Sequence, residues 1–358
     1  MRRRLPGFLV VLASFVLFLA GLSVWVARQA LKTDDWVHTS AALIRNPAIQ
    51  QETASYVADQ LVNQAALTDR IRQILPPRVQ KLAPTVAGAV PEFAERATLR
   101  ALRSGAFQKL WDDTNRAAHK QLVKAVTGDT SRTVVFDLRP MLGQVATRIG
   151  LGADVVNKLP PDRGKITIVR PDELVNARKI AHALKTLAIV FVLLSLALLV
   201  AAVWSSHERR RTLMQTGLGI FFAGFVLLLL RRILGHVIVD DLTSGGASEP
   251  AAQATWDIGT SLLRQIAISV VALGLIVMAS AWLAGPAKWA TRVRGWIGPT
   301  LRDQPAIAFA VALLVLVVLL ALSVIPGSSR PVLVIIYIVL VVVGVIALRR
   351  QVQAEAGN

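Results

Sequence analysis

Six long apolar runs without a charged side chain alternate with hydrophilic stretches along the chain. A helix needs about 20 predominantly apolar residues to cross the hydrocarbon core of a bilayer. The runs therefore predict six transmembrane helices. The first helix lies within residues 1–27, and the other five lie at about 184–204, 212–230, 265–285, 305–326 and 331–348.

The first apolar run raises a choice between a cleaved signal peptide and a permanent anchor. It covers residues 5–26 behind three arginines, whereas a cleaved signal has an apolar region of about 7–15 residues and small residues at positions −3 and −1. Cleavage after Ala27 would place Trp25 at −3, and cleavage after Ala30 would place Arg28 there. We therefore expect an uncleaved signal anchor.

The loops between the runs predict the orientation of the helices, because cytoplasmic loops are enriched in Lys and Arg. With a cytoplasmic N-terminus, the short inward segments hold twelve Lys and Arg residues, whereas the last outward turn, "IPGSSRP", holds only Arg330. We expect residues 1–27 to form the cytoplasmic N-terminus and first span. Residues 28–182 would then form an extracytoplasmic domain, and residues 183–358 a five-helix transmembrane domain with a cytoplasmic C-terminus.

The hydrophilic stretch 28–182 is predicted to be mostly helical. Asn46 and Pro47 are typical of the cap and the first position of a helix, and further helices are expected over 91–103 and 104–126. Nothing interrupts the helical pattern between Pro171 and Ser205, so the last helix of this domain is expected to continue into the second span.

Two short β-branched segments, "TVVFDL" and "KITIVR", predict a small two-stranded element in the same domain. The predicted fold class is therefore a mainly α membrane protein. It has six transmembrane helices and a mostly helical extracytoplasmic domain that contains this β element.

The net charge indicates which partners the chain attracts, and the lack of cysteine limits its chemistry. The chain has a formal net charge of +18 and no cysteine, which excludes disulfides and thiolate chemistry. Residues 28–182 hold 23 Lys and Arg against 15 Asp and Glu. Such a domain would be attracted to anionic lipid headgroups or acidic wall polymers, although a generally arginine-rich composition explains the same excess. Besides the lipid bilayer, we expect an envelope protein or one of these anionic surfaces as partner, and no nucleic acid.

The densest group of polar side chains is "LWDDTNRAAHKQL". On a helix, Trp111, Asn115 and His119 share one face because they are spaced four residues apart. A buried Asn–His pair could hold an imidazole tautomer for proton transfer or bind a small ligand. The alternative is a polar pair that positions this helix against its neighbours. Asp112 and Asp113 point to other faces and are interpreted as solvated charges.

Other candidate chemistry is weaker. The five histidines are far apart, so no metal site is predicted. Asp34 and Asp35 could attract a cation or mark the membrane interface, where Trp36 would be an aromatic anchor. The glycines of "GLGIFFAG" are interpreted as small residues that permit close helix packing rather than as a phosphate loop.

The predicted spans argue against two function classes. Spans two, four, five and six lack ionisable side chains in their centres, and ion-coupled transporters generally place such groups there. The spans also lack a paired nucleophile and base, which argues against an intramembrane hydrolase. We expect no catalytic residue, no cofactor and no enzyme activity.

Several segments carry a resemblance to a known group of proteins. "DDWVHTSAALIRNPAIQ", "LWDDTNRAAHKQLVKAVTG" and "VVFDLRPML" resemble actinobacterial polytopic integral membrane proteins with a large extracytoplasmic domain between the first two spans. This resemblance implies a bacterial plasma membrane and supplies no catalytic residue. In topology the chain is also similar to one half of the resistance-nodulation-division and mycobacterial large-membrane-protein transporters, but its fourth span lacks their acidic relay residues.

These observations favour a non-enzymatic envelope protein whose outer domain binds a protein, lipid or cell-wall partner. The alternative is a component of an export or lipid-transport system that depends on a separate energy source.

Overall fold

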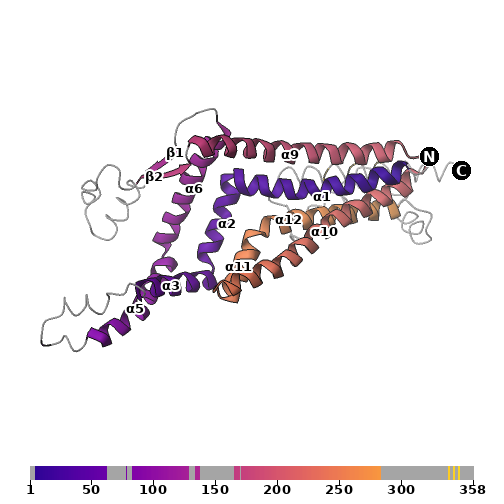
Figure 1. Cartoon of the computed structure of the whole chain (residues 1–358). Helices are drawn as coiled ribbons and strands as arrows, with labels where there is room; N and C mark the ends of the chain where they lie inside the picture. The colour runs from indigo at the N-terminus through magenta and orange to yellow at the C-terminus, as the bar shows by residue number, and fades with distance from the viewer. Residues whose placement is uncertain are drawn as a thin grey trace. The chain divides into compact units, whose positions relative to one another are not determined.

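The computed structural model describes residues 5–62, 78, 83–128, 134–137, 165–169 and 171–283, together with 338, 342 and 346. Apart from the three single residues 338, 342 and 346, the predicted spans at 305–326 and 331–348 and the C-terminal segment lie outside this described part. Within it the chain is mostly helical (Figure 1), which confirms the prediction of a mainly α protein.

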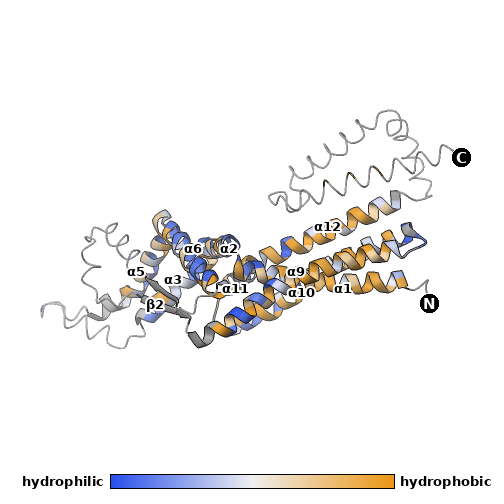
Figure 2. Ribbon diagram, turned by 90° about the horizontal axis from the view of Figure 1, so that it is seen from above, coloured by the Kyte–Doolittle hydropathy of each residue, from blue (hydrophilic) through white to orange (hydrophobic). Residues whose placement is uncertain are grey.

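Four of the described helices are long and apolar enough to cross a membrane. They are α1 (Leu5–Leu31), α9 (Pro171–Trp204), α10 (Arg209–Ser244) and α12 (Ser261–Leu283). Figure 2 shows apolar residues along much of these four helices and a mixed pattern on α2 and α6. Helix α9 runs without interruption from Pro171 to Trp204, so the predicted continuity of this helix into the second span is confirmed.

The chain forms two compact units. Unit 1 comprises residues 1–25, 185–232 and 262–358, and unit 2 comprises residues 26–184 and 233–261. The boundaries between the units fall inside α1, α9 and α10. Residues 233–261, which follow the predicted span at 212–230, thus belong to the same compact unit as the hydrophilic stretch 28–182.

Glycines allow the helices of unit 1 to pack backbone against backbone. A Cβ atom added at Gly217 would lie 2.7 Å from the Met278 backbone nitrogen, and one at Gly224 would lie 2.8 Å from the Ala267 carbonyl oxygen. Helices α10 and α12 therefore approach each other through glycine, as small residues commonly allow in membrane helices. This geometry confirms the close-packing interpretation of "GLGIFFAG".

Larger side chains fill the space beside these glycines. Leu227 is 1% exposed and packs with Leu263 and Ala267 in a buried cluster, against which Phe18 and Trp25 of α1 also lie. Helices α1, α10 and α12 thus share one apolar core within unit 1.

Helix α10 is longer than its apolar run. The span was predicted at about 212–230, but the helix continues through Arg231 and Arg232 to Ser244. Arginine is a good helix former, and no proline follows in this stretch. The helix ends where Gly246 adopts a φ of 102° and the Ala247 amide donates to the Leu242 carbonyl at 3.2 Å, an arrangement typical of a glycine-terminated helix.

Five shorter helices lie in the described part of unit 2. They are α2 (Thr33–Arg45), α3 (Pro47–Val62), α5 (Ala83–Arg103), α6 (Gly105–Thr127) and α11 (Glu249–Gly259). Helix α3 begins as predicted, because the Asn46 side-chain oxygen accepts a hydrogen bond from the Ala48 amide at 3.0 Å and Pro47 is the first helical residue. Ser104 caps α6 in the same way, accepting from the Phe107 amide at 3.2 Å.

Helix α5 begins earlier than expected. The prediction started this helix at Pro91, but Pro91 lies inside it and the helix starts at Ala83. An interior proline removes one backbone hydrogen bond and usually kinks a helix. The start was misplaced because proline is also the residue most typical of a first helical position, and the local sequence does not separate the two cases.

Two strands complete the described part of unit 2. Strand β1 (Val134–Asp137) pairs antiparallel with β2 (Lys165–Val169), with Val135 opposite Thr167 and Asp137 opposite Lys165. A register shift lies between Val134 and Val135.

Candidate functional site

The predicted polar face of α6 lies against α2 within unit 2 (Figure 1). The Trp111 indole nitrogen donates a hydrogen bond to the backbone carbonyl of Ser40 at 3.2 Å. On its own helix, Trp111 stacks with Phe107, and the ring centroids are 6.2 Å apart. The indole therefore ties the middle of α6 to α2.

His119 is the most buried member of this face, with 5% of its surface exposed. Its ring stacks on Trp36 with the centroids 5.2 Å apart and the planes at 15°. The Nδ1 atom lies 3.2 Å from the Thr33 hydroxyl oxygen. Trp36, which the sequence analysis interpreted as an anchor at the membrane interface, is thus also a packing partner of the imidazole.

Burial shifts the protonation of His119. Desolvation lowers the pKa of His119 from its ordinary value of 6.5, and a hydrogen bond with the backbone of Ala30 partly opposes this effect. Charging an imidazole inside a packed interface removes a cation from water, which is unfavourable without a charged partner. The neutral ring is therefore the form that this interface holds near neutral pH.

Asn115 and His119 have different hydrogen-bond partners. The Asn115 amide donates to the Trp111 carbonyl one turn earlier, at 3.0 Å, whereas His119 contacts Thr33 on α2. A side chain bonded within its own helix does not orient the imidazole of a neighbouring turn. The geometry therefore fits the positioning role that the sequence analysis set against proton transfer.

Ion pairs tie the polar residues of this region together. Asp35 receives a two-pronged contact from Arg28, with Nε to Oδ2 at 2.7 Å and the second guanidinium nitrogen to Oδ1 at 2.8 Å. Asp34 pairs with Arg116 of α6. Both acidic side chains predicted to attract a cation or mark the interface therefore have arginine partners in the described structure.

The prediction for Asp112 was wrong. We interpreted it as a solvated charge, but it pairs with Arg45 of α2. Its Oδ1 atom is buried and has no hydrogen-bond partner among the described residues. Asp112 thus belongs to the contact between α2 and α6, because a carboxylate on the flank of the buried face still reaches an arginine of the facing helix.

The contacts between α2 and α6 form one antiparallel series. Arg45 faces Asp112, Ser40 faces Trp111, and Thr33 faces His119. The sequence analysis missed the α2 side of this series. A signal was present, because Thr33, Trp36 and Ser40 recur at helical spacing on one face, but nothing in that spacing names the facing helix.

Metal binding has no support in the described part of the chain. Among the described residues, no group of three or more His, Asp or Glu side chains could hold a metal ion. The polar side chains gathered between α2 and α6 are instead engaged with one another. The contacts of Trp111 and His119 with α2 therefore orient the two helices relative to each other.

Neither a protein-family model nor a curated protein nor a solved structure matches the chain.

Proposed function

We propose that the protein is a non-enzymatic multi-pass protein of a bacterial plasma membrane whose extracytoplasmic domain binds a protein, lipid or cell-wall partner. Six spans anchor it, with both termini cytoplasmic and an uncleaved signal anchor at the start. The binding domain comprises residues 28–182 and includes the two-stranded β element.

The observation that carries this proposal is a pair of exposed aromatic side chains outside the candidate membrane spans. Tyr56 of α3 is 63% exposed and Phe93 of α5 is 69% exposed. Burying an aromatic or large aliphatic side chain contributes about 1.5–3 kcal/mol relative to leaving it in water. Aromatic residues are also enriched where proteins bind one another, so these two positions support a binding surface.

The neighbours of these aromatics are held in place by packing. Ala54 and Ala58 of α3 are buried, as is Ala94 of α5, and the Ser55 hydroxyl lies 3.4 Å from a Glu95 carboxylate oxygen. Tyr56 and Phe93 therefore project from a helix pair with its own buried contacts. A preformed surface binds at a lower entropic cost than a mobile one.

Engagement of the polar residues elsewhere supports a binding role over a chemical one. The side chains that suggested proton transfer, His119 and Asn115, have partners within or between helices. These hydrogen bonds stabilise α6 and its contact with α2. The excess of basic residues in 28–182 adds a long-range attraction for acidic partners.

The test is site-specific photocrosslinking in native membranes. A photoreactive amino acid is placed at Tyr56 or Phe93 in the full chain, and the crosslinked species are identified by mass spectrometry. The matched control is the same amino acid at Lys120, an exposed position on α6. The proposal predicts one discrete product at 56 or 93 that is absent at 120. Equal, diffuse labelling at all three positions would contradict it.

A further inference from the structure

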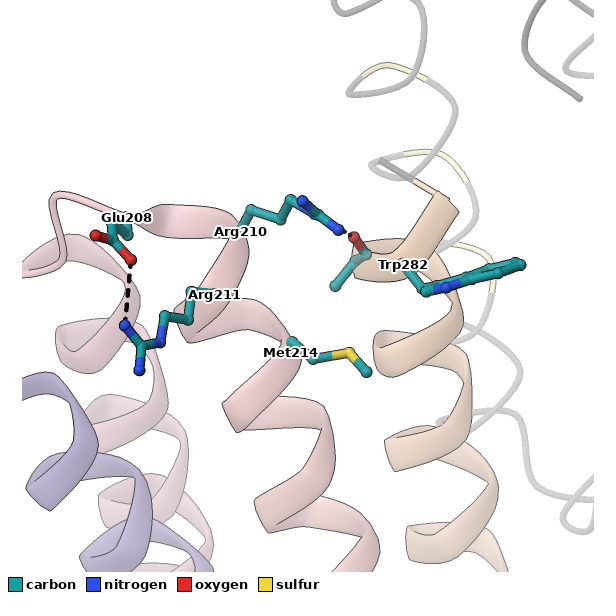
Figure 3. Close-up of a pocket in the computed structure, with 6 residues that line it drawn as sticks. Glu208, Arg210, Arg211, Met214 and Trp282 are labelled. Carbon is teal, nitrogen blue, oxygen red and sulfur yellow. Dashed lines mark hydrogen bonds and ion pairs between the residues drawn. The ribbon is translucent and has the colours of Figure 1, made fainter. Parts of the chain in front are cut away.

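A pocket lies in unit 1 at the place where α10 begins and α12 ends. Its volume is about 540 Å³, and its lining residues are Glu208, Arg210, Arg211, Met214, Ala281 and Trp282. Figure 3 shows that the basic side chains come from the first turn of α10 and that Trp282 comes from the end of α12. Ala281 precedes Trp282 in the last turn of α12.

The pocket lies at the ends of two candidate spans. One candidate span begins at Arg210 and another ends at Trp282. A third ends at Trp204, which is 81% exposed and is separated from α10 by residues 205–208 only. Tryptophan is enriched at the level of the lipid headgroups. Two tryptophans at neighbouring helix ends therefore place the pocket at that level of a bilayer.

Arg210 connects the two helices that line the pocket and has further N–H groups that a ligand could accept from. Its Nε atom donates to the Ala281 carbonyl at 3.3 Å, which ties the start of α10 to the end of α12 (Figure 3). A guanidinium has five N–H donors in a planar fork that matches phosphate oxygens. This bond to Ala281 orients the group, and among the described residues it leaves the terminal nitrogens available to an anion.

Arg211 supplies a second cation whose present partner is weakly held. It pairs with Glu208 at 3.6 Å, and both side chains are more than 70% exposed. Exposed ion pairs of this kind contribute little to stability and exchange partners readily. A phosphate with a higher charge density would compete with Glu208 for this guanidinium, and Glu208 would oppose the anion by charge repulsion.

The pocket also has an apolar side. Met214 lies one turn further along α10, and its side chain points towards α12 (Figure 3). A cationic rim above an apolar wall matches a molecule with a phosphate at one end and hydrocarbon at the other. Basic pockets between membrane helices are known to bind anionic lipid headgroups.

We infer that this pocket binds the headgroup of an anionic phospholipid from the surrounding bilayer. Arg210 and Arg211 contact the phosphate, and Met214 contacts the glycerol or the first part of an acyl chain. Free phosphate shares the charged part of this chemistry but makes no use of the apolar wall. This site differs from the surface that carries the proposed function, so the two fail independently.

Binding is measured with the purified full chain in detergent micelles. The probe is labelled phosphatidylglycerol, with phosphatidylcholine as the neutral comparison and inorganic phosphate as the competitor. The variants are Arg210→Gln, Arg211→Gln and Glu208→Gln, and the matched charge control is Lys185→Gln, at an exposed position on α9.

A saturable preference for phosphatidylglycerol is expected in the unaltered chain. Each arginine variant should weaken it by about fivefold, as expected for one basic residue near an anionic lipid. Glu208→Gln should strengthen it, and Lys185→Gln should leave it unchanged. The increase with Glu208→Gln keeps the test independent of any folding defect that Arg210→Gln causes.

Two outcomes would overturn the inference. The first is equal retention of phosphatidylglycerol by the unaltered chain and by the Arg211→Gln and Glu208→Gln variants. The second is complete displacement of the lipid by inorganic phosphate, which would assign the pocket to a free phosphate instead.

Discussion

Replacing Gly274 with alanine tests the backbone contact between α10 and α12. A Cβ atom at this position would lie 2.7 Å from the Phe221 Cα atom and 2.8 Å from the Gly217 carbonyl oxygen. Ordinary van der Waals contact begins at 3.4 Å. Both obstructing atoms are backbone, so no side-chain rotation relieves the overlap, and the helices must separate by several tenths of an ångström.

Separation of this size has a calculable consequence. Inserting a methyl-sized group into a well-packed interior typically costs about 1–3 kcal/mol, because neighbouring atoms lose contact along the whole seam. Alanine is also a better helix former than glycine by up to about 1 kcal/mol, and this gain offsets part of the loss. The expected net destabilisation of Gly274→Ala is about 1–2 kcal/mol.

The matched control is Gly7→Ala in α1. An added Cβ there would meet nothing within 4 Å, so only the gain in helix propensity remains and stability should hold or rise. Unfolding of the full chain in detergent is followed by the fluorescence of its eight tryptophans under increasing denaturant. A Gly274→Ala variant as stable as Gly7→Ala would refute the close approach of α10 and α12.

Three further predictions concern unit 2, and each is checked by denaturant unfolding of the full chain. Because the pKa of His119 is lowered on folding, its protonation favours the unfolded state, and the free energy of unfolding should fall as the pH drops below about 6.5. The His119→Gln variant should show a smaller fall over the same pH range. An unchanged fall would rule out the histidine as its cause. Asn46→Ala should lower the free energy of unfolding by about 1 kcal/mol, because α3 loses its cap. Ser248→Ala should lower it less, because the Ser248 side chain makes no cap bond. Equal losses would contradict the assignment of Asn46 as the cap of α3. Arg28→Lys should cost about 1 kcal/mol because lysine cannot reproduce the forked contact with Asp35, and wild-type stability would show that the fork contributes nothing.

Local signals in the sequence predicted several features well. The Asn46 cap and Pro47 start of α3 depend on backbone groups within one turn, and such groups are determined by nearby residues. The uninterrupted α9 follows from the lack of a helix breaker between Pro171 and Ser205. The close helix packing at Gly217 was also predictable from nearby residues, because a cluster of small residues in an apolar run is typical of such contacts.

Features that depend on distant residues were missed. Hydropathy marks where an apolar run ends, but helix α10 ends where Gly246 reverses the backbone. The place of residues 233–261 in unit 2 was missed because it also depends on distant residues. For example, the Ser248 amide donates a hydrogen bond to the Glu52 carboxylate at 3.1 Å. No local pattern near Ser248 specifies a partner so far away in the chain.

The candidate site shows the same division. The spacing of Trp111, Asn115 and His119 predicted that they share a face, and two of them, Trp111 and His119, contact α2. Their partners were not predictable, because Thr33 and Trp36 lie about 80 residues earlier. A helical stripe indicates that a face is buried, and only the fold determines what buries it.

The central proposal is that the apolar helices cross a membrane, with residues 28–182 outside the cytoplasm and the turn between α9 and α10 inside it. The chain contains no cysteine, so a single introduced cysteine reports one position. Lys120→Cys on α6 and His207→Cys in the turn, both at exposed positions, are treated with a membrane-impermeant maleimide in spheroplasts. The account predicts that Lys120→Cys is labelled in intact spheroplasts and that His207→Cys is labelled only after permeabilisation. Labelling of both positions from the same side would contradict it.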